Sequence, residues 1–361
     1  MSLIINNIMN KIYINGIGAV TPQGLAKRGT LLPEIFEYEE RFLQVQKPNY
    51  KEYVDAKSLR RMSKIVRMGV YAAFDAMKDA GVEQPDAILT GTGMGCQKDT
   101  EKFLNGMIEN DETFGNPTAF MQSTHNTVGA RIALMLGNQN ENFTYVHRTF
   151  SFETALIDSI LMLAEDKKNI LLGGIDEITE ESWLIKTHIN HYKKEAINNL
   201  QLIGDKQAGA LSGEGAMFFM LSAEKEKKSY AAVQDVKNFF RPKGVAEVNE
   251  KLDGFLKKNN LTVSDIDLVL MGYNGDPEFD SIYQSVEETM FQNQPVAYFK
   301  HLTGEYDTAS AFALMLAAKM ISGEHIPEII MKKGSAGKPE NILIYNQFRN
   351  INHTFLLLTN G

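Results

Sequence analysis

Apolar residues recur along this chain with two alternating periods. Within residues 60–80 they return every three or four positions, which predicts a helix with one buried face that ends at Gly81. The apolar residues that share this spacing are Met62, Val66, Val70, Ala73 and Met77. Further helices are predicted over 154–165 and 309–321. Short apolar runs of strand length predict strands at 11–15, 87–90, 143–146, 169–172, 217–221, 266–271, 341–345 and 355–359.

The order of these predicted elements repeats, which leads to the hypothesis of an internal duplication. Strands alternate with helices in residues 1–225, and a similar order returns in residues 226–361. Alternation of this kind is typical of α/β proteins whose sheets are covered on both faces. The pattern predicts two similar α/β halves with largely parallel sheets.

Glycines mark two places where the backbone turns or lies close to a neighbour. Gly16-Ile17-Gly18 after the first strand predicts a tight turn, but Thr21 and Pro22 exclude the third glycine and the helix of a dinucleotide-binding loop. The run Gly91-Thr92-Gly93-Met94-Gly95 follows the second strand and predicts a turn that other parts of the chain approach closely.

Composition and charge exclude several functional classes. The 361 residues carry a net charge of −8, which argues against a protein that neutralises nucleic-acid phosphates. The longest apolar stretches are far shorter than the roughly 20 residues of a membrane span. Residues 1–10 lack the basic start and long apolar core of a secretory leader. We expect a cytoplasmic protein with neither a nucleic-acid partner nor a membrane span.

Cysteine and histidine usage is equally restrictive. Cys96 is the single cysteine, so neither an internal disulfide nor a cysteine-based metal cluster can form. His188 and His191 lie three residues apart without a HExxH pattern. We expect no metal and no cofactor, and we interpret Cys96 as a buried small thiol.

Several segments, in order along nearly the whole chain, resemble the β-ketoacyl synthases. The opening strand with Gly16-Ile17-Gly18-Ala19-Val20-Thr21-Pro22 is similar to the family's Gly-x-Gly-x-Val-Thr-Pro turn. The loop 91–95, the segment 122–133, Gly173-Gly174 and 213–216 resemble later family motifs. This resemblance implies the duplicated five-layer αβαβα thiolase-like fold, a dimer, and partnership with an acyl carrier protein.

The resemblance also indicates which positions would carry condensation. The family uses a cysteine at the start of a helix, where the helix dipole favours the thiolate, and two histidines that stabilise an enolate. Here the nucleophile position reads Arg148, or Thr149 with a one-residue gap, and the first histidine position reads Gly272. The family's Lys-x-x-x-Gly-His motif reads Lys300 to Glu305, with glutamate in place of histidine. The resemblance therefore implies that no catalytic residue of the family site is intact.

Side-chain chemistry suggests what replaces that site. We predict an ion pair between Lys300 and Glu305 across one turn, and we consider Arg148 as a plug of the vacated space that pairs with Glu305. The glycines of the family's closing loop are absent from 346–352. A basic cluster is a candidate docking site for an acidic carrier protein, although it also fits an ordinary solvated helix face. Its members are Arg60, Arg61, Lys64 and Arg67.

Three functional hypotheses follow from the resemblance. The first is a non-condensing subunit, similar to the chain length factors of polyketide and polyene synthases, that pairs with an active synthase. The second is an enzyme with altered chemistry on acyl thioesters, such as an acyltransferase or a thioesterase. The third is a module that binds acyl chains or carrier proteins without a synthase partner.

Overall fold

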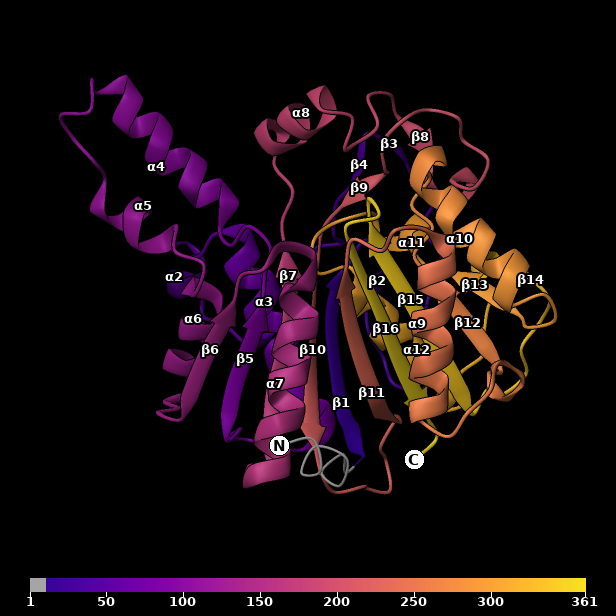
Figure 1. The fold of residues 1–361 in the computed structure, drawn as a ribbon. Helices are drawn as coiled ribbons and strands as arrows, with labels where there is room; N and C mark the ends of the chain where they lie inside the picture. Colours follow the sequence, from indigo (N-terminus) through magenta and orange to yellow (C-terminus); the bar gives the residue numbers. More distant parts are fainter. Residues whose placement is uncertain (1–10) are drawn as a thin grey trace.

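The computed structural model describes residues 11–361, so residues 1–10, in which no secretory leader is expected, lie outside the described residues (Figure 1). Its main feature is one 12-stranded sheet, in which the two-residue β2 (Gly24–Leu25) pairs with β1. The other strands follow in the order β14 (Met331–Lys333), β13 (Val296–Tyr298), β12 (Leu268–Met271), β15 (Asn341–Phe348), β16 (Asn352–Thr359), β11 (Ala231–Phe240), β1 (Ile12–Thr21), β10 (Gly215–Ser222), β7 (Asn169–Asp176), β5 (Ala87–Gly91) and β6 (Glu141–Tyr145).

The strand order is the same on both sides of the central β1–β11 pair. Moving outward, one side runs β1, β10, β7, β5, β6, and the other runs β11, β16, β15, β12, β13. If the five strands of each side are numbered by their order in the chain, both sides read 1, 5, 4, 2, 3 from the centre of the sheet outward. The structure therefore has the duplicated arrangement that the sequence predicted. The division at residue 225 falls in the link between β10 and β11 and stays a prediction.

The prediction of largely parallel sheets is wrong. Within the 12-stranded sheet of residues 11–361, only the pairs that β5 makes with β6 and β7, and those that β12 makes with β13 and β15, are parallel. Every pair that involves β1, β10, β11 or β16 is antiparallel. For β15 and β16 the physical reason is a link of only three residues, which cannot carry the chain back to start a parallel strand.

Helices cover and separate the two halves of the sheet, which produces five layers (Figure 1). α7 (Ser151–Glu165) and α12 (Ser310–Ile321) share the central core with inward residues of both halves. α3 (Lys64–Ala80) and α6 (Thr127–Leu136) cover the first half from outside. α9 (Val245–Lys258) and α10 (Pro277–Met290) cover the second. Every residue of α12 is buried, which explains why its sequence is apolar all round.

The predicted turn at Gly16-Ile17-Gly18 is also wrong, because β1 continues through it to Thr21. A Cβ on Gly16 would lie 2.2 Å from the Ala76 carbonyl oxygen, and one on Gly18 would lie 2.0 Å from that of Ala72. These glycines therefore permit α3 to lie directly against the strand. Their role is close packing rather than a change of chain direction.

The first predicted helix begins later than its apolar pattern suggested. The separate α2 (Ala56–Leu59) precedes it, with Asp55 accepting hydrogen bonds from two backbone N–H groups of its first turn, and α3 begins only at Lys64. Gly81 ends α3 in the left-handed conformation, as predicted. The remaining predicted strands and helices are present, with ends that differ by a few residues.

Two helical segments stand away from the main body. α4 (Gln97–Glu109) and α5 (Pro117–Gln122) project on the side of the molecule where β6 is the edge strand, and α8 (Glu180–His188) lies above the strand ends (Figure 1). Among residues 11–361, no helix combines the length and apolarity that a bilayer crossing requires.

Candidate functional site

The position that matches the family nucleophile lies where β6 leads into α7. A short 3-10 turn, Arg148–Phe150, joins them, and Arg148 has a φ of 48°, which is unusual for a residue other than glycine. Ser151 holds the turn, because its Oγ accepts from the His147 N–H at 2.8 Å and donates to the Arg148 carbonyl at 2.6 Å. The local geometry thus keeps a strained backbone at the start of the central helix, with an arginine on it.

Thr149, the other candidate position, is buried beside Arg148. Its Oγ1 accepts a hydrogen bond of 2.8 Å from Asn352 Nδ2. No histidine or carboxylate is hydrogen-bonded to this hydroxyl among the described residues, so it lacks the adjacent base that would activate it.

Gly272, at the first histidine position, has no room for a side chain. A Cβ built there would lie 2.4 Å from Asn346 Oδ1, 2.6 Å from the Tyr283 hydroxyl and 3.2 Å from Lys300 Cε. Tyr283 is completely buried and its hydroxyl accepts from the Gln347 N–H at 2.7 Å. The space that an imidazole would need is therefore filled by a hydrogen-bonded tyrosine and an asparagine.

Lys300 and Glu305 form the predicted ion pair. Lys300 Nζ lies 2.7 Å from Glu305 Oε2, and both side chains are almost fully buried. The same carboxylate oxygen accepts from Asn274 Nδ2 at 2.7 Å. The glutamate is thus bound by a cation and an amide from two elements, which leaves it as a structural acceptor rather than a free acid.

What remains of the central pocket is a cavity of about 30 Å³, enough for one or two water molecules. Its lining residues are Arg148, Lys186, His191, Tyr192, Glu305, Tyr306, Asp307 and Phe348. Arg148 does line the space, as predicted, but no ion pair joins it to Glu305 anywhere in residues 11–361, so that part of the prediction is wrong. The reason is that Lys300 and Asn274 already bind the Glu305 carboxylate.

Asp307 and Lys186 are further charged groups of this cavity that the sequence did not single out. Burial raises the pKa of the Asp307 carboxyl, while the nearby Lys186 and Arg148 cations oppose that rise. Burial disfavours the Lys186 cation, but Tyr192 and Asp307 more than compensate and its pKa is raised. Lys186 Nζ also donates to the Tyr192 hydroxyl at 3.2 Å. The charges of the cavity therefore offset one another.

Asp176 at the end of β7 connects the glycine loop to the second half of the chain. Its Oδ1 accepts from the Gly93 N–H at 2.8 Å, and its Oδ2 accepts from the N–H and the hydroxyl of Thr308. Burial and the charge of Asp307 raise the pKa of Asp176 to about 6. A Cβ on Gly93 would lie 2.0 Å from Asp307 Oδ2. The predicted close approach to the 91–95 loop is confirmed.

The closing loop, predicted to have lost its glycines, is a tight turn between β15 and β16. Arg349 and Asn350 both have a positive φ, and the Ile351 N–H donates to the Phe348 carbonyl at 2.8 Å. Arg349 donates to the Asn190 carbonyl at 3.0 Å and lies 3.8 Å from the Asp276 carboxylate. These contacts fix the turn beside the small cavity.

Glu153, one turn into α7, is the most isolated buried carboxyl of this region. It is fully buried, and neither carboxyl oxygen has a hydrogen-bond partner within the described chain. Burial raises its pKa to about 7. No local pattern of residues could have identified it, because its surroundings come from α12 and the Lys300 segment.

The structure divides the predicted docking cluster. Lys64 Nζ lies 2.5 Å from the buried Glu214 carboxylate, and Arg67 Nε donates to the Met62 carbonyl at 2.9 Å. Arg60 and Arg61 are exposed. Two of the four cations are thus bound internally.

Cys96 is buried, as predicted, and burial raises the pKa of its thiol to about 12, far from a reactive thiolate.

Comparisons with known proteins agree with this geometry. Residues 39–202 match the family model of the beta-ketoacyl synthase N-terminal domain. No curated protein matches the sequence significantly. The fold is similar to the ishigamide ketosynthase/chain length factor, with a TM-score of 0.79, 15% identity, and coverage of 98% of this chain and 100% of that one.

Two further solved structures have the same fold. One is a beta-ketoacyl synthase from Burkholderia phymatum STM815, with a TM-score of 0.78, 16% identity, and coverage of 98% and 100%. The other is a type II polyketide synthase acyl-carrier protein in complex with its ketosynthase bound to the hexaketide, with a TM-score of 0.73, 12% identity, and the same coverage. Residues 39–202 thus match a β-ketoacyl synthase N-terminal domain, and the chain as a whole has the fold of solved ketosynthases.

Proposed function

We propose that this protein is a non-condensing member of the β-ketoacyl synthase family. It pairs with an active synthase and its acyl carrier protein in cytoplasmic synthesis of polyketide or fatty-acid type. The observation that carries the proposal is the closed site. Gly272 has no space for an imidazole, Glu305 is bound to Lys300, and the remaining cavity of about 30 Å³ has no room for a thioester. Condensation needs an acyl carrier and an enolate stabiliser, and this chain supplies neither.

A second observation supports a partner subunit. β6 is the edge of the main sheet, and Phe143 on it and Val146 just beyond it are exposed. An edge strand with exposed apolar side chains favours pairing with another chain. More exposed apolar residues lie on the neighbouring elements on the same side of the molecule: Leu104 and Ile108 on α4, Phe120 and Met121 on α5, and Leu134 on α6 (Figure 1).

Similar folds in known assemblies suggest what the partner is. One related structure is a ketosynthase/chain length factor, and another is an acyl-carrier protein in complex with its ketosynthase. A complete fold with a closed site is what we expect of the chain length factor in such a pair, which influences the length of the product. The ketosynthase subunit would form the carbon–carbon bond.

Intact-mass measurement tests the closed site. The purified protein is incubated with acyl and malonyl carrier proteins, and an active synthase serves as the positive control. We expect neither a covalent adduct on this chain nor loss of thioester from the carriers. An adduct would favour an acyltransferase, and thioester hydrolysis would favour a thioesterase; either result contradicts the proposal.

Co-expression with candidate synthases tests the partner. We expect a stable complex and a change in product length when this chain is present. Phe143→Lys should abolish the complex because it places a charge on the edge strand. Phe240→Lys is the matched control, since Phe240 is also exposed (60%, against 45% for Phe143) but ends β11, away from β6. A complex that loses affinity equally with both variants, or no complex with any synthase, would exclude this role.

A further inference from the structure

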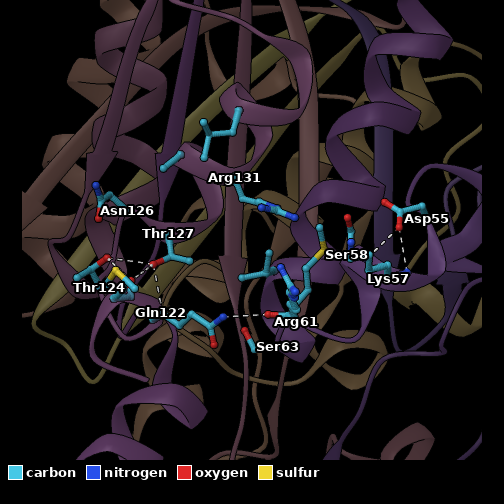
Figure 2. A pocket seen from close by; sticks show the side chains of 15 residues that line it. Asp55, Lys57, Ser58, Arg61, Ser63, Gln122, Thr124, Asn126, Thr127 and Arg131 are labelled. Atoms are coloured by element: carbon cyan, nitrogen blue, oxygen red, sulfur yellow. Dashed lines mark hydrogen bonds between the residues drawn. The ribbon is translucent and has the colours of Figure 1, made fainter. Parts of the chain in front are cut away.

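A large groove lies on the outer surface of the first half, away from the closed site. Its volume is about 770 Å³, within the range of roughly 300–1,000 Å³ that small-molecule sites occupy. α2 and the start of α3 form one wall, and α5 and α6 form the other (Figure 2). The closed-site argument above does not use this groove, although Met121 and Leu134 in its lining also belong to the exposed apolar surface described above.

The groove contains three cations. Lys57 and Arg61 lie on one wall and Arg131 on the other, whereas the chain as a whole carries a net charge of −8. Asp55 is the single carboxylate among the lining residues, and its Oδ1 accepts from the backbone N–H groups of Lys57 and Ser58. The carboxylate is thereby used to begin α2, and the three side-chain cations have no ion-pair partner of their own in the described structure.

Arg131 gives the strongest indication of a ligand. It comes from α6, and its guanidinium points toward the opposite wall, where Ser58 and Arg61 lie (Figure 2). Its Nε–H is buried and makes no hydrogen bond within residues 11–361. A buried N–H of a guanidinium that lacks a partner costs on the order of 1–3 kcal/mol, and an anion in the groove would remove that cost.

Apolar residues from both walls also line the groove. These residues are Met62, Val66, Met121, Ala130 and Leu134. Met121 and Leu134 are exposed at its rim, while Met62 and Val66 are buried. A purely inorganic anion would leave these apolar side chains in contact with water, and a neutral hydrocarbon would leave the Arg131 N–H unpaired.

We propose that this groove binds a small amphiphilic anion, which consists of a carboxylate or phosphate head on an apolar chain. The head lies between Arg61 and Arg131, where planar guanidinium groups bind such oxygens. The chain lies along Val66, Ala130 and Leu134. This site shares no lining residue with the closed cavity.

Titration calorimetry of the full-length protein below the micelle concentration tests this site with four probes. Decanoate and decyl phosphate carry both features, decanol has only the chain, and inorganic phosphate has only the head. We expect decanoate, decyl phosphate or both to bind at least about tenfold more tightly than decanol and phosphate. The tighter of the two acids identifies the preferred head group.

Matched variants locate the binding. Arg131→Met and Arg61→Met should each weaken the bound acid about tenfold, because each removes a charged hydrogen-bond donor. Arg60→Met is the control, since Arg60 is exposed next to Arg61 but does not line the groove. The proposal is overturned if no probe binds, if decanol or phosphate binds as tightly as the acids, or if Arg60→Met weakens binding as much as the other two variants.

Discussion

The closed cavity and the outer groove contain the same kinds of side chain but differ in how their charges are satisfied. In the closed cavity Glu305 is bound by Lys300 and Asn274, and Asp307 lies near Lys186 and Arg148. In the outer groove Arg131 has a buried N–H without a partner, and the one carboxylate present is bound to the backbone. A set of charges that compensate internally closes a site, whereas uncompensated charge leaves a site that a ligand can complete.

The largest expected effect comes from removing one charge of the closed cavity. Lys300→Met should lower the free energy of unfolding by about 4 kcal/mol, because Glu305 would remain buried without its cation. Urea denaturation measures the change. Lys300→Met combined with Glu305→Leu should recover most of the loss, since no charge then stays buried. A double variant as unstable as the single one would mean that packing, not charge, holds this region.

A smaller effect is expected from adding a methyl group where the family has a histidine. Gly272→Ala should lower the free energy of unfolding by about 3 kcal/mol, because the new Cβ would overlap Asn346 and Tyr283. Gly254→Ala in α9 is the control, since a Cβ there meets nothing within 4 Å. If both variants unfold at the same denaturant concentration, the space at Gly272 is not closed.

The free energy of unfolding should depend on pH through Glu153, the buried carboxyl beside the closed cavity. Glu153 has a pKa of about 7 in the folded protein and a lower ordinary value of 4.5, so the folded state holds its proton more tightly. Its contribution is fully present below about pH 4.5 and is lost as pH rises through 7, at a cost of about 3 kcal/mol at pH 8.

Glu153→Gln cannot lose that proton, so its stability should fall less between pH 5 and pH 8 than that of the unmodified protein. Glu165→Gln, at the exposed end of the same helix, should leave the pH profile unchanged. Denaturant midpoints at the two pH values provide the comparison. Equal pH profiles for Glu153→Gln and the unmodified protein would contradict the buried-carboxyl account.

The smallest effect on folding is expected in the outer groove. Arg131→Met should leave the free energy of unfolding unchanged or raise it by about 1 kcal/mol, because it removes a buried N–H that has no partner to lose. Thermal or urea unfolding without added ligand measures it. A loss above about 2 kcal/mol would show that Arg131 is bound within the protein and would remove the difference between the two sites.

Local sequence patterns predicted most of the elements and failed where packing decides. The helix ending at Gly81 was predictable, because a periodic apolar face and a following glycine are local features. Gly16 and Gly18 were interpreted as a turn, since a glycine required by an approaching helix and a glycine required by a turn look alike in one sequence.

The sequence by itself determined that the chain has a single cysteine, Cys96, which lies outside the segment that the resemblance assigns to the nucleophile. It also determined the Lys300–Glu305 pair, whose members are five residues apart. Only the tertiary structure decided that Gly272 has no space, that Arg148 does not pair with Glu305, and that Arg131 faces an open groove. These outcomes depend on side chains from segments distant in sequence, and such proximity arises only when the chain folds.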